Sequence, residues 1–282
     1  ERIRVFMIIW IASYPKSGNT WLRAFLCSYF YMDLEKENFN FNKLNKITLF
    51  PRIENFEDIG VTPKTFEEVT KAWIPAQNKI NSNNKVNFLK THNGFGSLNN
   101  CNFTDRKNTL GAIYLVRDPR DVLMSLSKHL NKNISECLKI ILHKNHMGVL
   151  QGTKNVFGEM RGNWAQNYNS WKNFNIREKI IIKYEDMIEN PFYNFSKIIN
   201  FINKLFKVEI NKEKIKKCIE ICKFQNLQNL EKKIGFVENL EKNELFFNKG
   251  QIKKWQNKID KKILYEIEKN FEKEMKELGY LT

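Results

Sequence analysis

A short segment near the amino terminus has the residue types needed to bind a phosphate group. It is Tyr14-Pro-Lys-Ser-Gly-Asn-Thr-Trp21, which lies between an apolar run and an apolar stripe at helical spacing. Backbone N–H groups at such a strand-to-helix turn form an anion nest, and the helix N-terminus adds partial positive charge. Gly18 lets the backbone approach a phosphate, and Lys16 supplies a mobile positive charge. The other hydrogen-bond donors of this segment are Ser17, Asn19 and Thr20. The common triphosphate loop is a different pattern, with its lysine after the second glycine.

A second segment, Ile113–Ser125, offers another cation for an anionic ligand. Arg117 follows an expected strand, and Ser125 lies two turns into the helix expected after it. Arginine suits phosphate because its planar guanidinium donates hydrogen bonds in pairs and stays charged. The alternative is that Arg117 only pairs with Asp118 or Asp121.

Two further segments place a reactive side chain at an expected strand end. They are Phe88-Leu-Lys-Thr-His92 and Lys183-Tyr-Glu-Asp-Met187. Of the histidines His92, His129, His143 and His146, only His92 has this setting. In an open parallel sheet, ligands bind at the carboxyl ends of the strands. The residues expected at that edge are Lys16, His92, Arg117 and Tyr184.

These segments resemble the motifs of the PAPS-dependent sulfotransferases, where PAPS is 3′-phosphoadenosine 5′-phosphosulfate and PAP is the product nucleotide. The resemblance spans roughly Ile8 to Trp255. The first segment matches the 5′-phosphosulfate loop YPKSGTTW at seven of eight positions, with Asn19 in place of a threonine. The others resemble the 3′-phosphate segment around Arg117, the KTH segment with the family's catalytic histidine, and the YEDM segment, whose tyrosine contacts the adenine side.

The C-terminal resemblance is weaker. Asn248–Trp255 resembles the family's RKGxxGDW, but Asn248 replaces the arginine and Lys253 replaces the second glycine. Lys249 or Lys253 could compensate for the missing arginine. Cys222-Lys-Phe224 stands in the place of the TSF segment, so Phe224 could stack on adenine. The family's KxxxTVxxxE dimer motif is absent after Trp255, so that dimer is not expected here.

The resemblance thus implies a full set of site residues. The nucleotide-binding residues would be Lys16, Ser17, Gly18, Asn19, Thr20, Trp21, Arg117, Ser125, Tyr184, Phe224, Lys249 and Gly250. The catalytic residues would be His92, Lys16, Lys90 and Ser125. His92 would remove the acceptor's proton as general base, and Lys16 would stabilise the bridging oxygen of the leaving phosphate. Lys90 could hold the transferring group, Ser125 would bind the 3′-phosphate, and no metal is expected.

The elements that must position these residues alternate along the chain. The runs that predict buried parallel strands are Val5–Ala12, Val86–Leu89, Leu110–Val116 and Lys179–Tyr184. Helices are predicted from an apolar stripe over Trp21–Tyr29, from Asp118-Pro119, from Asn190-Pro191 before Phe192–Phe206, and over Lys258–Leu278. Surface loops are predicted at Phe39–Asn55 and Asn78–Lys85. We therefore expect an α/β fold, a single domain over 1–282 with a central, mainly parallel sheet flanked by helices and a P-loop-like nucleotide-binding core.

Composition narrows the class of protein. The chain has 282 residues and a formal net charge of +16, which favours an anionic partner, although a Lys-rich solvated surface is an equal alternative. Five scattered cysteines without a CxxC pair favour a reduced, cytoplasmic protein. The run Val5–Ala12 is too short to cross a bilayer and lacks a signal-peptide cleavage pattern, so no transmembrane segment is expected.

Other functions remain open at this level. A P-loop kinase of a small metabolite would share the sheet and the anion nest, but the chain lacks a clear Mg²⁺-binding aspartate on a second strand. A nucleic-acid-binding protein would cluster its basic residues along one element, whereas here they are spread among acids. A fold that has lost catalysis would not need both Lys16 and His92. The acceptor (a small molecule, lipid or glycan) is set in the family by loops over the pocket, here Phe39–Lys79, Asn93–Lys107 and His129–Trp164.

Overall fold

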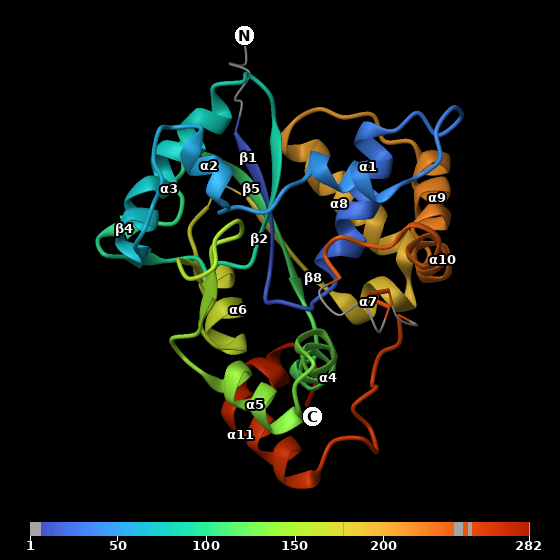
Figure 1. Ribbon diagram of the computed structural model, residues 1–282. Coiled ribbons are helices and arrows are strands. Elements are labelled where there is room, and N and C mark those ends of the chain that lie inside the picture. Colours follow the sequence, from blue (N-terminus) through green and yellow to red (C-terminus); the bar gives the residue numbers. More distant parts are fainter. Residues whose placement is uncertain (1–6, 177, 240–244, 248–249, 282) are drawn as a thin grey trace. The chain divides into compact units, whose positions relative to one another are not determined.

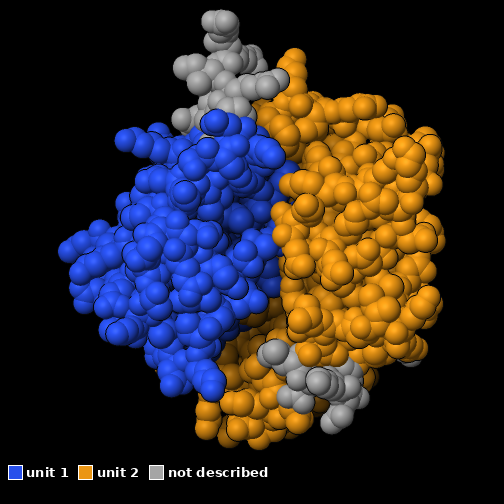
Figure 2. Space-filling view, turned by 45° about the horizontal axis from the view of Figure 1, so that its top comes forward, with its two compact units in different colours: residues 1–14, 47–115, 144–181 blue, residues 15–46, 116–143, 182–282 orange. Residues whose placement is uncertain are grey.

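The computed structural model of the protein describes residues 7–176, 178–239, 245–247 and 250–281. The chain forms two compact units, each assembled from separate stretches of sequence. Unit 1 consists of residues 1–14, 47–115 and 144–181, and unit 2 of residues 15–46, 116–143 and 182–282 (Figure 2). One boundary falls after Tyr14, just past β1, and two others fall inside β5 and β8, so most of the sheet belongs to unit 1 and Pro15–Trp21 to unit 2.

Unit 1 is built on a four-stranded sheet with the order β2-β1-β5-β8 (Figure 1). Its strands are β1 (Ile8–Ser13), β2 (Asn87–Thr91), β5 (Thr109–Val116) and β8 (Lys179–Lys183), of which the last residues of β5 and β8 belong to unit 2. β1 pairs in parallel with both β2 and β5, placing Trp10 beside Leu89 on one side and Ala112 on the other. Every residue of β1 and β5 is buried, because parallel strands have no solvated face.

Short elements complete unit 1. The helices are α2 (Ile53–Glu57), α3 (Phe66–Asn81) and α6 (Trp164–Asn173), and the hairpins are β3 (Ser97–Leu98) with β4 (Cys101–Asn102) and β6 (Met147–Val149) with β7 (Phe157–Met160). A Thr65 capping box starts α3. Trp10 and Phe103 lie in the core with ring centroids 5.1 Å apart.

Unit 2 is helical. Its elements are α1 (Asn19–Tyr31), the 3₁₀ helix η1 (Phe41–Lys46), α4 (Pro119–Leu130), α5 (Ile134–Leu142), α7 (Tyr184–Glu189), α8 (Pro191–Leu205), α9 (Lys212–Ile221), α10 (Phe224–Ile234) and α11 (Lys261–Glu277). One group packs α1 and α8 on α9, and another packs α4 and α5 on α11 (Figure 1). The Asp118 side chain accepts a hydrogen bond from the Arg120 N–H, and Asn190 caps α8 in the same way.

The expected α/β class with a central parallel sheet flanked by helices is confirmed, and the strands lie close to their predicted bounds, with Val5 and Phe6 outside the described residues. The predicted loop at Phe39–Asn55 is wrong. It contains η1 and the start of α2, and Phe41, Leu44 and Phe50 are buried. Phe41 stacks on Phe247, a partner that no local pattern reveals. The start of the other predicted loop, Asn78–Asn81, belongs to α3.

The expected acceptor loops also contain regular structure, including α2, α3 and α5. Within the described part of the chain, no helix is both long and apolar enough to cross a membrane. The single-domain organisation over 1–282 stays a prediction.

Candidate active site

The phosphate loop has the backbone expected of an anion nest. Lys16 and Gly18 both have positive φ, at 68° and 98°, and Gly18 is the N-cap of α1. The first turn of α1 contains no acidic residue, so nothing there neutralises the positive end of the helix dipole. Ser17 is buried at 1% exposure, and its Oγ has no hydrogen-bond partner among the described residues. A buried, unpartnered hydroxyl beside a helix N-terminus fits a bound phosphate oxygen.

Tyr184 and Arg117 close on this loop within unit 2. A Cβ added at Gly18 would lie 2.5 Å from Cδ2 of the Tyr184 ring, so only glycine fits there. The Arg117 guanidinium lies 4.2 Å from the centre of the same ring and donates a hydrogen bond to the Lys16 carbonyl at 3.1 Å. Burial raises the pKa of Tyr184 to about 12, against the opposing effect of Arg117. The Tyr184 hydroxyl is therefore neutral at physiological pH.

The predicted adenine-side residues also meet in unit 2. The Trp21 ring lies 5.1 Å from that of Phe224, and its Nε1 donates to the Cys222 carbonyl at 2.9 Å. A Cβ added at Gly250, where φ is 58°, would lie 2.4 Å from the Phe224 ring. Cys222 is fully buried, and burial raises the pKa of its thiol. Cys222 thus contacts the Trp21–Phe224 pair through its backbone carbonyl.

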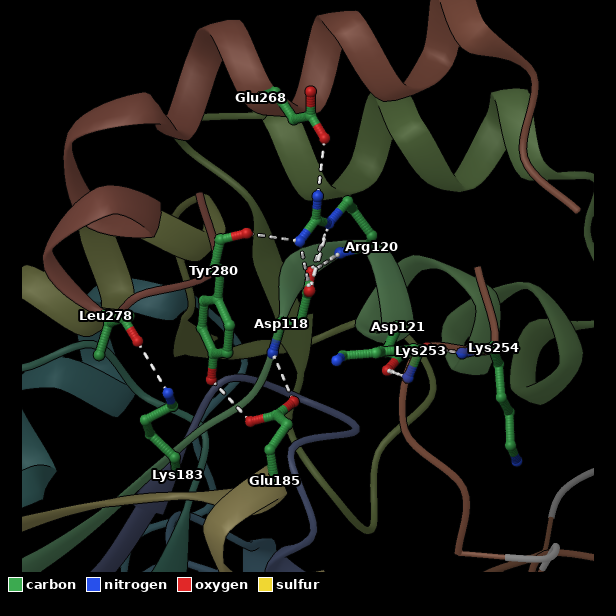
Figure 3. Close-up of polar contacts among 10 residues, drawn as sticks. All are labelled: Asp118, Arg120, Asp121, Lys183, Glu185, Lys253, Lys254, Glu268, Leu278 and Tyr280. Carbon is green, nitrogen blue, oxygen red and sulfur yellow. Dashed lines mark hydrogen bonds and ion pairs between the residues drawn. The ribbon is translucent and has the colours of Figure 1, made fainter. Parts of the chain in front are cut away.

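The C-terminal segment is fastened to α4 by an aspartate. The Asp121 carboxylate accepts from the backbone N–H groups of Lys253 and Lys254, at 2.7 and 2.8 Å (Figure 3). Lys253 has a φ of 58°, so it adopts the conformation that suits the glycine of the family's motif. Burial lowers the pKa of Lys254, and the charge of Arg117 lowers it further. Lys254 and Arg117 are therefore close enough for their charges to interact. The predicted site residues Asn248 and Lys249 lie outside the described residues.

The acids next to Arg117 have other partners. Asp118 forms an ion pair with Arg120 at 2.7 Å, and Asp121 binds the C-terminal segment. Arg117 itself donates to the carbonyls of Lys16 and, at 3.5 Å, Gln251. The charge of Arg117 also opposes the larger effect of burial on the pKa of Asp121, so the two side chains interact electrostatically, and the ligand-binding role of Arg117 stays a prediction.

His92 lies in unit 1, directly after β2. Its Nδ1 is 2.8 Å from the Ser13 carbonyl oxygen at the end of β1. Because a carbonyl oxygen only accepts, Nδ1 must carry the hydrogen, and the lone pair of the neutral ring lies on Nε2. Nε2 is the nitrogen that a general base would use.

Helix α6 fixes the turn that carries His92. The Asn167 amide donates to the His92 carbonyl at 3.0 Å, and Trp171 Nε1 donates to the Asn93 carbonyl at 2.8 Å. Trp164 and Trp171 are both buried, as expected for packing residues. Sequence reasoning missed Asn167, although it lies three residues after one of these tryptophans and four before the other, on the same helical face.

The remaining predicted catalytic residues are Lys90, Ser125 and Lys16. Lys90 is half-buried on β2, and its backbone N–H donates to the Thr48 carbonyl at 2.8 Å. Ser125 is half-buried on α4. The Lys16 ammonium lies 4.3 Å from the centre of the Phe246 ring. Among the described residues, no group of three or more His, Cys, Asp or Glu side chains could hold a metal ion.

Comparison with known proteins gives the family. The sulfotransferase domain model matches residues 8–279, and the chain belongs to this family. The chain is 24% identical to flavonol 3-sulfotransferase of Flaveria bidentis, over 96% of this chain and 82% of the relative. It is 25% identical to cytosolic sulfotransferase 14 of Arabidopsis thaliana, over 86% and 67% of the two chains.

Solved structures support the fold. A mouse sulfotransferase in complex with PAP has a TM-score of 0.60 at 19% identity, over 95% of this chain and 84% of that one. Retinol dehydratase in complex with androsterone and PAP has a TM-score of 0.62 at 17% identity, over 95% and 80%. The predicted sulfotransferase class is confirmed, and the kinase and nucleic-acid alternatives lose their support.

Proposed function

We propose that the protein transfers a sulfuryl group from PAPS to an acceptor hydroxyl or amine and releases PAP. The observation that carries this proposal is the mutual contact of Gly18, Arg117 and Tyr184 in unit 2. They come from separate segments of the sequence, and each segment resembles a nucleotide-binding motif of the family. Gly18 leaves no room for a side chain of its own beside the Tyr184 ring, and the Arg117 guanidinium packs on that ring. This arrangement supports a preformed donor site.

The residues of unit 2 suit the parts of such a nucleotide. Ser17 and the N-terminus of α1 suit the 5′-phosphate, since they offer donors in a buried setting without acidic neighbours. Arg117 and Ser125 suit the 3′-phosphate. Trp21, Tyr184 and Phe224 are the aromatic candidates for the adenine, and of these Phe224 is half-buried while the other two are buried.

The chemistry rests on proton removal and charge stabilisation. The bound donor supplies an activated sulfuryl group on a good leaving group. His92 accepts the acceptor's proton at Nε2, because Nδ1–H is held by the Ser13 carbonyl. Lys16 places positive charge where the leaving phosphate oxygen becomes more negative. Lys90 holds the transferring group, and Ser125 holds the 3′-phosphate.

The acceptor is a small molecule, lipid or glycan. Curated relatives are named flavonol sulfotransferases, and one neighbouring structure holds androsterone. Phenols and steroid alcohols are therefore the first classes to screen with PAPS. A cytoplasmic location is part of the proposal, since several relatives are named cytosolic.

The test is calorimetric titration with PAP, beside ATP with Mg²⁺, on wild type and Lys16→Ala/Arg117→Ala. The matched control is Lys71→Ala/Lys276→Ala, which removes the same charge from exposed ion pairs. We expect micromolar or tighter PAP binding in wild type and control, at least about a hundredfold weaker in the site variant.

Three outcomes would contradict the proposal. A folded wild type that does not bind PAP overturns it, and preferential binding of ATP with Mg²⁺ would favour the kinase. Equal loss of affinity in both double variants would show a general charge effect rather than a site.

A further inference from the structure

The end of the chain reaches the residues next to the candidate nucleotide contacts. The Glu185 carboxylate accepts from the Asp118 backbone N–H at 3.0 Å and from the Tyr280 hydroxyl at 2.8 Å (Figure 3). Asp118 follows Arg117 in the chain, and Glu185 follows Tyr184. One carboxylate therefore connects the backbones of the two candidate binding residues, and its other oxygen is held by Tyr280.

Tyr280 is fixed on a second side by the residue before Tyr184. The Lys183 ammonium donates to the Leu278 carbonyl at 2.8 Å and lies 4.8 Å from the centre of the Tyr280 ring (Figure 3). Lys183 and Glu185 flank Tyr184, so both neighbours of this tyrosine are hydrogen-bonded to the C-terminal turn, residues 278–280 after α11. Small shifts of this turn would therefore reach the Tyr184 ring.

Arg120 links the same turn to α4. Its guanidinium donates to the Asp118 carboxylate at 2.7 Å, to Glu268 of α11 at 2.7 Å and to the Tyr280 carbonyl at 2.8 Å. It also lies 3.9 Å from the centre of the Trp255 ring, in the C-terminal segment. A buried arginine with a carboxylate, a carbonyl and an aromatic ring around it has little freedom to move. Asp118, and with it Arg117, is held at a fixed distance from α11.

We propose that Tyr280 and Glu185 are positioning residues that hold Arg117 and Tyr184 in place for the donor nucleotide. Nucleotide affinity then depends on residues 278–280, which are not among the predicted nucleotide-binding residues. This inference rests on the proposed function, because it assumes that unit 2 binds PAP. The Tyr280 phenol stays a donor at physiological pH, because desolvation by burial and the charge of the Glu185 carboxylate raise its pKa well above the ordinary value.

The test is PAP titration of Tyr280→Phe, which removes only the hydroxyl. The control is Tyr265→Phe, which removes the hydroxyl of an exposed tyrosine on α11. We expect PAP affinity to fall about fivefold to tenfold in Tyr280→Phe and less than about 1.5-fold in Tyr265→Phe. Thermal unfolding of both variants, measured alongside, separates affinity from stability.

A double-mutant cycle distinguishes positioning from a general structural effect. In the Arg117→Ala background, Tyr280→Phe should weaken PAP binding less than it does in the wild-type background, because one of the two groups that it positions is gone. The proposal is overturned if Tyr280→Phe lowers only the unfolding temperature, or if its effect on PAP affinity is equal in both backgrounds. Failure of the proposed function itself would be seen separately, as a folded wild type that does not bind PAP.

Discussion

The two units hold their candidate site residues in different ways. In unit 2, the residues that resemble nucleotide contacts touch one another: Tyr184 lies on Gly18, Arg117 lies on Tyr184, and Phe224 lies beside Trp21. In unit 1, the candidate base His92 is held by the main chain of β1 and by Asn167 of α6. The binding residues form a mutually dependent cluster, whereas the base is set by a rigid sheet.

This difference separates the expected effects of substitutions. A change in the unit 2 cluster should disturb several contacts at once and lower nucleotide affinity. A change at His92 should leave the nucleotide site intact and affect only the chemical step. The following variants test that separation.

The largest effect is expected at His92. His92→Ala should lower the rate of sulfuryl transfer to any acceptor found by screening about 10²-fold to 10⁴-fold, because the general base is lost. PAP affinity should stay within about twofold of wild type. Steady-state rates with PAPS and PAP titration measure the two quantities, and His143→Ala, at an exposed histidine, is the control. A loss of PAP affinity in His92→Ala would contradict the expectation that a change at His92 leaves the nucleotide site of unit 2 intact.

Gly18→Ala should be the most damaging small change in unit 2. The new Cβ would overlap the buried Tyr184 ring at 2.5 Å, and a φ of 98° is unfavourable for alanine. We expect a loss of about 2 to 4 kcal/mol in the free energy of unfolding together with loss of PAP binding. Denaturant unfolding measures the first and calorimetry the second.

Gly235→Ala provides the matched control for that variant. Gly235 also has a positive φ, 74°, but nothing lies within 4 Å of an added Cβ. Gly235→Ala should lower the free energy of unfolding by about 1 to 2 kcal/mol and leave PAP binding unchanged. Equal costs at both glycines would show that the Tyr184 contact contributes nothing.

The raised pKa of Tyr184 should make the free energy of unfolding depend on pH in the alkaline range. That pKa is raised to about 12, so the folded state keeps the phenol proton where the unfolded state, with a pKa of about 10, loses it. This contribution to stability is complete below pH ~10 and is lost as the pH rises through ~12. Wild type should lose about 1 kcal/mol more than Tyr184→Phe between pH ~9 and ~11 in denaturant unfolding. Tyr193→Phe, at an exposed tyrosine, should follow wild type, and the same slope in all three proteins would contradict the prediction.

The smallest effect is expected where a lysine occupies the motif's glycine position. Lys253 has a φ of 58°, which brings its Cβ close to the following carbonyl oxygen, whereas Asn84 of unit 1 has a φ of 57° and asparagine tolerates this region through local hydrogen bonds. Lys253→Gly should therefore be more favourable than Asn84→Gly by about 0.5 to 1 kcal/mol in the free energy of unfolding. Urea unfolding compares the two, and a larger gain at Asn84 would argue against strain at Lys253.

Local sequence signals located the strands of the sheet and the starts of two helices, while the site residues they suggested stay a prediction. Apolar runs predicted the strands of the sheet, and Asp118-Pro119 and Asn190-Pro191 predicted the starts of two helices, because periodicity and capping act over a few residues. The motif at Tyr14–Trp21 lies at the predicted strand-to-helix turn. The predicted loops at Phe39–Asn55 and Asn78–Lys85 did less well, since the first contains η1 and the start of α2 and the second begins inside α3.

Contacts between distant segments were decided only by the tertiary structure. Phe41 is buried because it stacks on Phe247, and Asn167 supports His92 across 75 residues of sequence. The hydrogen bond between Tyr280 and Glu185 likewise joins residues 95 positions apart. Such pairs leave no periodic or capping pattern, because their geometry depends on how strands and helices pack and not on the neighbouring residues. The sequence by itself indicated the strands of the sheet, the starts of two helices and the candidate nucleotide-binding residues, whereas the packing of the elements decided which distant side chains contact them.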